Sequence, residues 1–582
     1  MRTGQRTVVV LVAAAFVVAA CGPAVGPSPS TQPPSPGASA AASPSPTGVP
    51  RGGSITYVNF EPATLNPLNR PEAVAWQVNR FVARGLSELD ARTGEWIPQL
   101  AESLPTIENG GVSPDGLTVT WRLREGLKWS DGKPLTSDDL KFTWEVCSNP
   151  EAGCARSEGF VDIASVETPD DRTIVLRYKK LYQNYLGQFR DGILPRHSSD
   201  VGPIADFARW EYGRTVNPGT GPFVVKEWVA GDRIVLERNP NFYLAAEGKP
   251  YLDRITVVFR NEQEAGRQMV LNGEAQMYPW PGRDAPIINQ LIAAGLQVQS
   301  NPSPYVRMLT LNPWDPADVT KPHPVLGDKR VREAIYSGLN FENVFLTYDN
   351  PEQGIKGKRL TTIFDMWPQY TCGIEPFPYD LVRAGQLLDE AGWRMGGDGY
   401  RAKDGQRLRL RITVYTGFGE EDREVVLIDE AKKLGIELVP FNHDAAVLYS
   451  GYNDGSPMMR GDFDLLWWDE TPQMPDPSGR LVGFFHSRSI PGPTNNYAYN
   501  IVRLSDPEVD AWIDEATSTL DTAVRKDRQC KVSQRRIKED IVWRWMIAPT
   551  QYWISSPQLK GWVGNELFSP IGWDAENWYL EP

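Results

Sequence analysis

Residues 114–139 carry the most tightly specified local structure in this 582-residue chain. The Asp-Gly pair at 115–116 is typical of a turn, because glycine accepts a positive φ and aspartate can bond its own backbone. Residues 118–123 then alternate apolar and polar side chains, which predicts a half-buried strand. After another turn, Thr136 or Ser137 is expected to cap a helix whose first turn carries two carboxylates. This order of turn, strand, turn and helix fixes the local structure but names no function.

The length and charge of the chain restrict its class. With 582 residues it is too long for one hydrophobic core and is expected to form two or more lobes. Its 60 Lys+Arg against 73 Asp+Glu leave a net charge of -13, which argues against nucleic acid as a partner. Most of its 20 tryptophans are expected to be buried in cores.

The N-terminus has the pattern of an export signal. A short basic region with Arg2 and Arg6 precedes an apolar run over residues 8–20. This run is shorter than the roughly 20 residues of a membrane span but suits a signal peptide. Small residues before Cys21 resemble a bacterial lipobox, which implies cleavage after Ala20 and lipidation of the Cys21 sulfur. The alternative is ordinary signal cleavage with an incidental cysteine.

Residues 22–50 are mostly proline, serine, alanine, glycine and threonine and contain no charge. Such a composition cannot form a core and indicates a tether. No later segment is apolar enough to span a membrane. We therefore expect a folded body outside the cytoplasm, held at the cell membrane, on its periplasmic or extracellular face, by a lipid anchor of several acyl chains.

Four cysteines remain in the exported chain, where disulfides persist. Cys147 and Cys154 flank a loop containing proline and glycine and are expected to pair locally. Cys372 and Cys530 would then form a long-range disulfide. Four cysteines allow three pairings, so the sequence leaves the connectivity open.

Other local signals predict hairpins and helices along the chain. Residues 223–238 read as two strands around an Ala-Gly-Asp turn. Asp328 is expected to cap a helix, and residues 380–392 form another helix with a glycine just past its end. Glu508 follows Ser505 by three residues, which suggests a capping box.

The sequence PDGLTVTWRLREGLKWSDGKPLTSDDLKFTWE, residues 114–145, closely resembles the signature of the family 5 extracytoplasmic solute-binding proteins, the receptors of oligopeptide and dipeptide ABC importers. The resemblance extends in order from about Gly52 to the C-terminus. Further blocks that carry it are GLSELDARTGEWIPQLAESL (85–104), NPGTGPF (217–223), LNGEAQM (271–277), DKRVREAIYSGLN (328–340) and LLDEAGW (387–393).

The resemblance implies an α/β, periplasmic-binding-protein-like fold of the large, class II-like kind. Two large lobes are joined by hinge crossovers, and a smaller lobe is inserted into the first. The expected division is signal peptide 1–20, lipidated cysteine and linker 21–50, lobe I 51–84, 204–304 and 549–582, insertion lobe II 85–203, and lobe III 305–548.

Catalytic and metal motifs are not recognisable. There is no Gly-x-Ser-x-Gly elbow, and neither glycine-rich stretch has the spacing of a phosphate-binding loop. The four histidines have no ligand-like spacing and are expected to be structural or on the surface: His197, His323, His443 and His486. We expect no enzyme, no metal and no cofactor. An exported hydrolase, with a nucleophile and base meeting in the cleft, is the alternative from another class.

Residues 463–477 are the most informative segment for ligand binding. The resemblance implies that this segment faces the cleft, where family members place an aspartate that receives the ammonium of a bound peptide. Aligning the Asp-Pro ends without gaps puts Gln473 at that aspartate and Glu470 at a tryptophan. A neutral amide holds an ammonium less well, so recognition of a free amino terminus is in question.

Three interpretations of this segment remain open. Asp469 or Glu470 supplies the missing charge from a shifted loop. Alternatively, Trp467 and Trp468 stack on the faces of sugars. In the third interpretation, residues 465–468 are a buried strand whose indoles pack inward. The resemblance adds three weaker ligand-binding residues: Asn66, Asn496 and Tyr497.

The expected function is reversible capture of a peptide or another small polar solute by closure of the lobes, followed by delivery to ABC permease subunits. The runner-up is a receptor for oligosaccharides or another polar solute. We expect a monomer. A purely structural surface protein would show no lobe closure on any ligand.

Overall fold

The computed structural model describes residues 48–66, 68–69, 73–154, 157–416, 419–471, 476 and 478–582. The signal peptide, Cys21, most of the tether and Gln473 lie outside the described residues. The residues from Gly48 to Pro582 form one compact unit. None of the described helices has both the length and the apolar character needed to cross a membrane.

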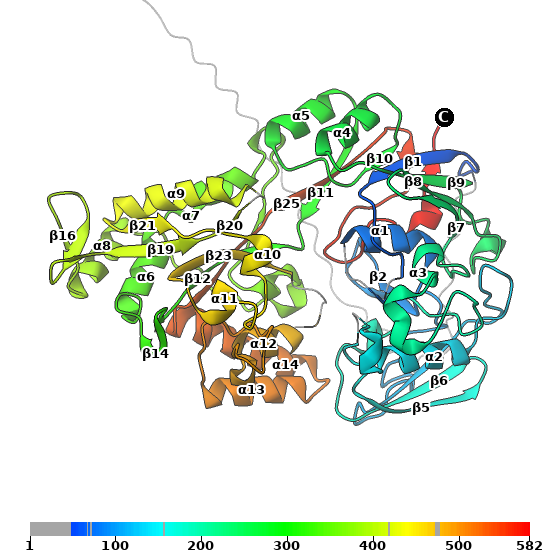
Figure 1. Ribbon diagram of the computed structural model, residues 1–582, viewed down its shortest axis with the longest axis horizontal. Helices are drawn as coiled ribbons and strands as arrows, with labels where there is room; N and C mark the ends of the chain where they lie inside the picture. Colours follow the sequence, from blue (N-terminus) through cyan, green and yellow to red (C-terminus); the bar gives the residue numbers. More distant parts are fainter. Residues whose placement is uncertain are drawn as a thin grey trace, which may run out of the picture. The chain divides into compact units, whose positions relative to one another are not determined.

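A seven-stranded sheet is assembled from three distant parts of the chain (Figure 1). Its central strand β1 is parallel to β9 and β10, and its outer pairs are antiparallel. In spatial order the strands are β11 (Gln297–Pro302), β25 (Thr550–Ser555), β10 (Met277–Tyr278), β1 (Ser54–Asn59), β9 (Arg254–Phe259), β8 (Arg233–Arg238) and β7 (Phe223–Val229). The antiparallel pairing of β7 with β8 confirms the hairpin predicted over residues 223–238.

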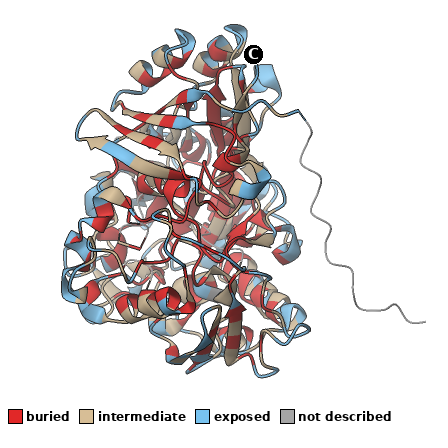
Figure 2. Ribbon diagram, turned by 90° about the vertical axis from the view of Figure 1, so that its right-hand side faces the viewer, coloured by how far each residue is buried: buried red, intermediate tan, exposed pale blue. Residues whose placement is uncertain are grey.

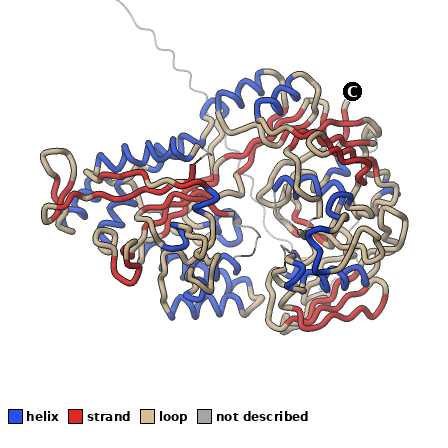
Figure 3. The backbone as a smooth tube through the Cα atoms, in the orientation of Figure 1, coloured by secondary structure: helices blue, strands red, loops and turns tan. Residues whose placement is uncertain are grey.

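A six-stranded mixed sheet forms the centre of the second half. Its strands in spatial order are β15 (Lys358–Arg359), β24 (Trp543–Ala548), β12 (Val306–Leu311), β23 (Leu465–Glu470), β19 (Arg409–Thr413) and β21 (Glu437–Pro440). Helices cover both of its faces (Figure 3). One face packs on α6 (Lys329–Gly338), α8 (Leu381–Glu390) and α9 (Glu420–Lys433); the other packs on α12 (Ser478–Phe485), α13 (Pro507–Thr517) and α14 (Thr522–Gln534).

Two short crossovers connect these sheets. Residues 303–305 lead from β11 to β12, and Pro549 leads from β24 back to β25. The backbone N–H of Ser303 donates to the carbonyl of Pro549 at 2.7 Å, so the crossovers lie side by side. A motion of one sheet relative to the other would therefore act on two adjacent backbone segments.

A three-stranded sheet carries the strand and helix that opened the sequence analysis. Its order is β4 (Thr118–Arg122), β6 (Thr173–Tyr178) and β5 (Ile163–Asp170), and it packs against α2 (Ser137–Cys147). Val119 and Trp121 on β4 are buried, as the alternation predicts. Thr136 is the N-cap of α2, and its N–H donates to Asp139 Oδ2 at 3.0 Å in a capping box.

The described cysteines form two disulfides. Cys147 and Cys154 are joined after α2, and Cys372 is joined to Cys530 on α14. These are the two pairs expected from the sequence. The second closes a sequence separation of 158 residues, so it constrains the unfolded chain over a long loop.

The cap predicted at Asp328 and the helix predicted from residue 380 agree with the structure, and one other predicted cap differs. Asp328 caps α6 and Asp380 caps α8 with their side chains. At α13, however, the cap is Asp506, which accepts from the backbone N–H of Glu508 at 3.1 Å. The predicted capping box of Ser505 and Glu508 is therefore wrong by one position, because aspartate is an equally good N-cap and precedes a proline suited to the first helical position.

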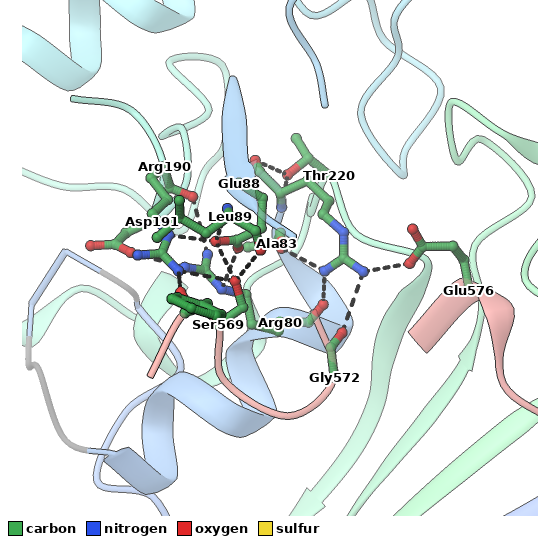
Figure 4. Close-up of polar contacts among 12 residues, drawn as sticks. Arg80, Ala83, Glu88, Leu89, Arg190, Asp191, Thr220, Ser569, Gly572 and Glu576 are labelled. Carbon is green, nitrogen blue, oxygen red and sulfur yellow. Dashed lines mark hydrogen bonds and ion pairs between the residues drawn. The ribbon is translucent and has the colours of Figure 1, made fainter. Parts of the chain in front are cut away.

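A buried ionic network fastens α1 (Ala73–Val82) to residues 190–191 and to the C-terminal segment (Figure 4). We call it the joint cluster: Arg80, Arg84, Glu88, Arg190, Asp191 and Glu576. Arg80 forms ion pairs with Glu88 at 3.1 Å and Asp191 at 3.0 Å. Arg84 donates to Glu576 at 2.6 Å, and Arg190 pairs with the other oxygen of Glu88.

The backbone at this joint is packed too tightly for side chains at two glycines. A Cβ on Gly85 would lie 2.0 Å from the carbonyl oxygen of Phe189, and a Cβ on Gly221 would lie 2.4 Å from the carbonyl carbon of Val82. The N–H of Gly221 donates to the Val82 carbonyl at 2.9 Å. The Gly-Thr-Gly segment thus returns along the end of α1, consistent with the close backbone approach that glycine permits. Buried residues concentrate in the interior of the protein, and exposed residues lie on its outer helices and loops (Figure 2).

Candidate functional site

Arg307 lies on β12, directly after the crossover at residues 303–305. It is 3% exposed, and its Nε donates to Oε1 of Glu420 at 2.9 Å. Asp469, its cross-strand neighbour on β23, forms a second ion pair with it. Burial alone would lower the pKa of Arg307, but the charges of Asp469 and Glu420 raise it. We call Arg307, Glu420 and Asp469 the paired cluster.

Neutral donors complete the surroundings of both carboxylates in the paired cluster. The donors are the hydroxyls of Tyr449 (2.7 Å) and Tyr415 (3.1 Å) to Asp469, and the Tyr348 hydroxyl (2.6 Å) and Trp467 indole (2.9 Å) to Glu420. Burial would raise the pKa of Glu420, but Arg307 and these donors lower it. Asp469 already has a guanidinium and two hydroxyls as partners, so its charge is matched within the protein.

Trp467 and Trp468 lie on opposite faces of β23, in the two cores beside the six-stranded sheet. Both are 0% exposed. The Trp468 indole donates to Thr310 Oγ1 at 3.0 Å, and its ring stacks on Tyr499 with centroids 6.1 Å apart. In this conformation the two indoles are core residues, as in the buried-strand interpretation. Stacking on a sugar is not compatible with this arrangement, because the ring faces are covered by protein.

Glu470 also has an arginine partner. Its Oε1 accepts from Arg480 Nη2 at 3.0 Å and from the backbone N–H of Thr471 at 2.8 Å. Burial raises the pKa of Glu470. Gln473, the position aligned with the family's anchoring aspartate, lies outside the described residues. Of the two carboxylates considered as replacements for it, neither is free of a cation.

The three weaker predictions fall at separate places. Asn66 is 1% exposed and its Oδ1 accepts from the N–H of Leu68 at 3.2 Å. Asn496 Oδ1 accepts from the N–H of Asn453 at 2.7 Å, so this side chain orders a neighbouring turn. Tyr497 is 61% exposed. Among the described residues, none of these three forms a hydrogen bond with the paired cluster, and their role in ligand binding stays a prediction.

Two charged residues beside the crossovers have no ion-pair partner among the described residues: Arg283 and Glu566. Arg283 is exposed, and its closest polar contact is with Ser303 Oγ at 3.5 Å. Desolvation by surrounding protein and the charge of Arg307 both lower the pKa of Arg283. The Arg283 side chain is thus accessible to solvent on one side and surrounded by protein on the other. We call Arg283 and Glu566 the unpaired charges.

Glu566 is half-buried and held by two amides. Its Oε1 accepts from Gln77 Nε2, and its Oε2 accepts from Gln551 Nε2 at 2.7 Å. Burial raises the pKa of Glu566. The Gln77 amide is fixed in this orientation because its own oxygen accepts from Tyr57 at 3.2 Å and from Asn59 at 3.0 Å.

Tyr305 is the residue directly before β12, next to the paired cluster in the sequence. It belongs to the first crossover and is 37% exposed. After burial, the groups that shift its pKa are Glu566 and Asp469, which raise it, and Arg283 and Arg307, which lower it. All four charges therefore influence the pKa of this partly exposed phenol at the crossover.

The surrounding network lies at the carboxyl ends of parallel strands. Asn59 ends β1, and its Oδ1 accepts from the indole of Trp280, just past the end of β10, at 2.9 Å. Ligands in open α/β sheets bind outside the carboxyl ends of strands. Sequence reasoning missed Arg283 and Glu566 because each is a lone charge in a loop. The one sequence signal that could have indicated Arg283 is its position six residues after the family block 271–277.

A separate pocket of about 430 Å³ lies between residues 158–184 and α12. Its lining includes Tyr182, Gln183, Asp476 and Arg480. Arg480 also bonds Glu470, so the pocket adjoins the segment singled out by the sequence. Within the described part of the chain, no group of three or more His, Cys, Asp or Glu side chains is arranged to hold a metal ion.

Comparison with known proteins identifies the family. The model for "Bacterial extracellular solute-binding proteins, family 5 Middle" matches residues 95–492. The oligopeptide-binding protein AppA of Bacillus subtilis is 26% identical over 525 residues, covering 88% of this chain and 89% of that protein.

Solved structures show the same fold. That AppA in complex with a nonapeptide has a TM-score of 0.66 at 24% identity, covering 92% of this chain and all of that one. NikA from Brucella suis in complex with Fe(III)-EDTA has a TM-score of 0.74 at 21% identity, covering 91% of this chain and all of that one. These likenesses confirm the expected two-lobe α/β architecture. The chain belongs to family 5 of the bacterial extracellular solute-binding proteins.

Proposed function

We propose that this protein is the substrate-binding lipoprotein of an ABC importer, which captures peptides outside the cytoplasmic membrane and delivers them to the permease. The observation that supports this most directly is the pair of hydrogen-bonded crossovers between two sheets, with accessible charged groups beside them. Closure about such crossovers changes the shape of the protein when a ligand binds, and a permease can recognise that change. The oligopeptide-binding relative supports a peptide as the ligand.

The sheets support the proposed lobes. The chain passes from the seven-stranded to the six-stranded sheet between Pro302 and Val306, and returns between Ala548 and Thr550. These positions agree with the boundaries placed at 304/305 and 548/549. We propose lobe I around the first sheet, lobe III around the second, and the insertion lobe over residues 85–203.

The N-terminal segment is proposed to tether this body to the membrane. Cleavage before Cys21 and lipidation of its sulfur would leave residues 22–50 as a spacer. We expect Cys21→Ala to abolish incorporation of labelled fatty acid and to release the protein from the membrane fraction. Unchanged labelling and fractionation would contradict the anchor. We propose that the protein acts as a monomer, needs no cofactor and has no catalytic activity.

Another polar solute is the second candidate ligand. Structures with this fold contain ligands other than peptides, such as Fe(III)-EDTA in NikA. The observation that favours this alternative is the engagement of Asp469 by Arg307, because no free carboxylate on β23 awaits an ammonium. Oligosaccharides gain less support, since the indoles of Trp467 and Trp468 are covered.

Identification of the natural ligand tests the proposal. The chain from residue 22 onward is purified without denaturation, then denatured, and the released compounds are identified by mass spectrometry. Peptides of a restricted length are expected. Masses spaced by hexose units would contradict peptide capture and support the oligosaccharide alternative. Small-angle scattering should show a smaller radius of gyration with ligand than without it.

A further inference from the structure

The charged groups at the crossovers differ in whether the protein satisfies them. Arg307 has two carboxylate partners, and each of those carboxylates has two further donors. Each charge in this cluster therefore has an oppositely charged partner within the protein. Arg283 and Glu566 form no ion pair with any described residue, and for the half-buried Glu566 an unpaired charge is unfavourable.

Arg283 is suited to bind an anion. A guanidinium offers five N–H donors, and the contact to Ser303 Oγ at 3.5 Å uses at most one. The nearby charge of Arg307 repels it, so a bound carboxylate would relieve both this repulsion and the loss of water. The planar donors match the two oxygens of a carboxylate.

Glu566 is suited to bind a cation. Each of its oxygens receives one amide N–H, which leaves lone pairs on both. Gln551 donates its Nε2 to Glu566, and its own Oε1 is buried without a hydrogen-bond partner among the described residues. This second acceptor belongs to the same amide, so an ammonium beside Glu566 would satisfy two oxygen acceptors that the protein leaves open.

Arg283 and Glu566 each form a hydrogen bond with a residue in or beside a crossover. Arg283 contacts Ser303 on the first crossover, and Glu566 is held by Gln551 two residues after Pro549 on the second. The charge of Arg283 lowers the pKa of Glu566, yet the two form no ion pair. They are therefore near enough to interact and are held apart.

From this geometry we propose that Arg283 and Glu566 select a zwitterionic solute, with Arg283 binding its carboxylate and Glu566 and Gln551 Oε1 binding its ammonium. The proposal rests on the proposed function and specifies its ligand class: a short peptide or amino-acid derivative with both ends free. A ligand that bridges these groups contacts both crossovers and favours the closed arrangement for which it has the higher affinity. In this proposal the buried paired cluster keeps its internal ion pairs and does not bind the charged ends of the ligand.

The test uses three tetrapeptide libraries of equal composition: one with free ends, one C-amidated and one N-acetylated. Dissociation constants are measured with the full mature chain. Wild-type protein is expected to bind the free library about tenfold to a hundredfold more tightly than either blocked library, which is the range for losing one charge-assisted hydrogen-bonded contact.

Two variants separate the roles. Arg283→Gln should reduce the preference for free over amidated peptides to about one while keeping the preference over acetylated peptides, because only the carboxylate partner is lost. Glu566→Gln should have the opposite pattern. Arg209→Gln and Glu125→Gln make the same changes at exposed sites outside this region and should keep both preferences. Each readout is a ratio within one variant, so reduced stability alone does not imitate it.

The outcomes are distinguishable from failure of the proposed function. If the wild-type protein binds all three libraries equally, or if Arg283→Gln and Glu566→Gln retain both preferences, the assignment of the unpaired charges is wrong and peptide capture stands. If the wild-type protein binds none of the libraries, peptide capture fails and the assignment fails with it.

Discussion

The joint cluster and the crossover region use the same residue types in different ways. In the joint cluster, three arginines meet three carboxylates, and Arg80, Arg84 and Glu88 are at most 1% exposed. At the crossovers, Arg307 is equally well paired, but Arg283 and Glu566 have no ionic partner among the described residues. A network whose charges are all matched fastens backbone segments together. Charges left unmatched beside a hinge are available for a ligand.

The difference also explains why carboxylate identity is a poor guide to the site. Asp469 was a candidate anchor because of its position in the sequence. Its cross-strand partner Arg307 is 162 residues away and neutralises it. Glu566 was not considered, yet it retains open acceptor sites. In this comparison the two carboxylates differ in whether a cation of the protein pairs with them, and not in their type.

The largest decrease in the free energy of unfolding is expected when one charge is removed from the joint cluster. Glu88→Gln leaves Arg80 and Arg190 without the carboxylate they share, and a buried pair broken on one side costs about 3–5 kcal/mol. The free energy of unfolding in urea, followed by tryptophan fluorescence, measures this loss. Glu125→Gln, an exposed site, should change it by less than about 0.5 kcal/mol. A loss no larger than that of the control would show that the joint cluster does not fasten these segments.

Removing the cation of the paired cluster should also lower the free energy of unfolding, by an amount that depends on pH. Arg307→Met leaves Glu420 and Asp469 buried without a cation, and we expect a loss of about 3 kcal/mol at pH 7. The pKa of Glu420 is lowered in the fold, so its stabilising contribution is present above the ordinary value of about 4 and is lost as the pH falls through the lower folded value. The difference in unfolding free energy between wild type and variant should therefore shrink in acid. A difference that grows in acid would contradict the ion pairs.

Asp574 sharpens the comparison because its charge is only partly matched. Burial raises its pKa to about 7, although Arg92 donates to it at 2.6 Å. A carboxyl with a raised folded pKa stabilises the fold at low pH, and this contribution is lost between the ordinary value of about 4 and about 7. We expect a loss of roughly 2–4 kcal/mol over this window, since a tenfold change in a dissociation constant corresponds to about 1.4 kcal/mol. Asp574→Asn should flatten the pH dependence of unfolding, and an unchanged slope would contradict the shift.

The smallest effect is expected at Tyr497. This side chain is 61% exposed, and its hydroxyl donates to Asp454 Oδ2, which belongs to neither the paired cluster nor the unpaired charges. Tyr497→Ala should change the unfolding free energy by less than about 0.5 kcal/mol and should keep both end-group preferences. A loss of either preference would place the binding site nearer to residues 495–497, as the family resemblance implied.

Local structure was largely predictable from the sequence because its causes are local. Alternation gave β4, a turn between two strands gave the β7–β8 hairpin, and Asp328 and Asp380 gave helix starts. The same reasoning misplaced the cap at Asp506 by one residue, since two good capping residues stood side by side.

The site was less predictable because its contacts are long-range. The apolar run before Asp469 allowed either a buried strand or an aromatic binding surface, and only burial on both faces of the sheet distinguished them. Arg283 and Glu566 lie in the same region because β10 and β25, which precede them in the chain, are neighbours in one sheet. No spacing rule connects residues brought together by such topology.

A crystal structure of the protein purified with its own ligand tests the central claim most directly. The account predicts a ligand carboxylate on Arg283 and an ammonium on Glu566 and Gln551 Oε1, with Arg307 still paired to Asp469. If Asp469 has left Arg307 to hold the ligand while Arg283 and Glu566 face solvent, the distinction between paired and unpaired charges is wrong.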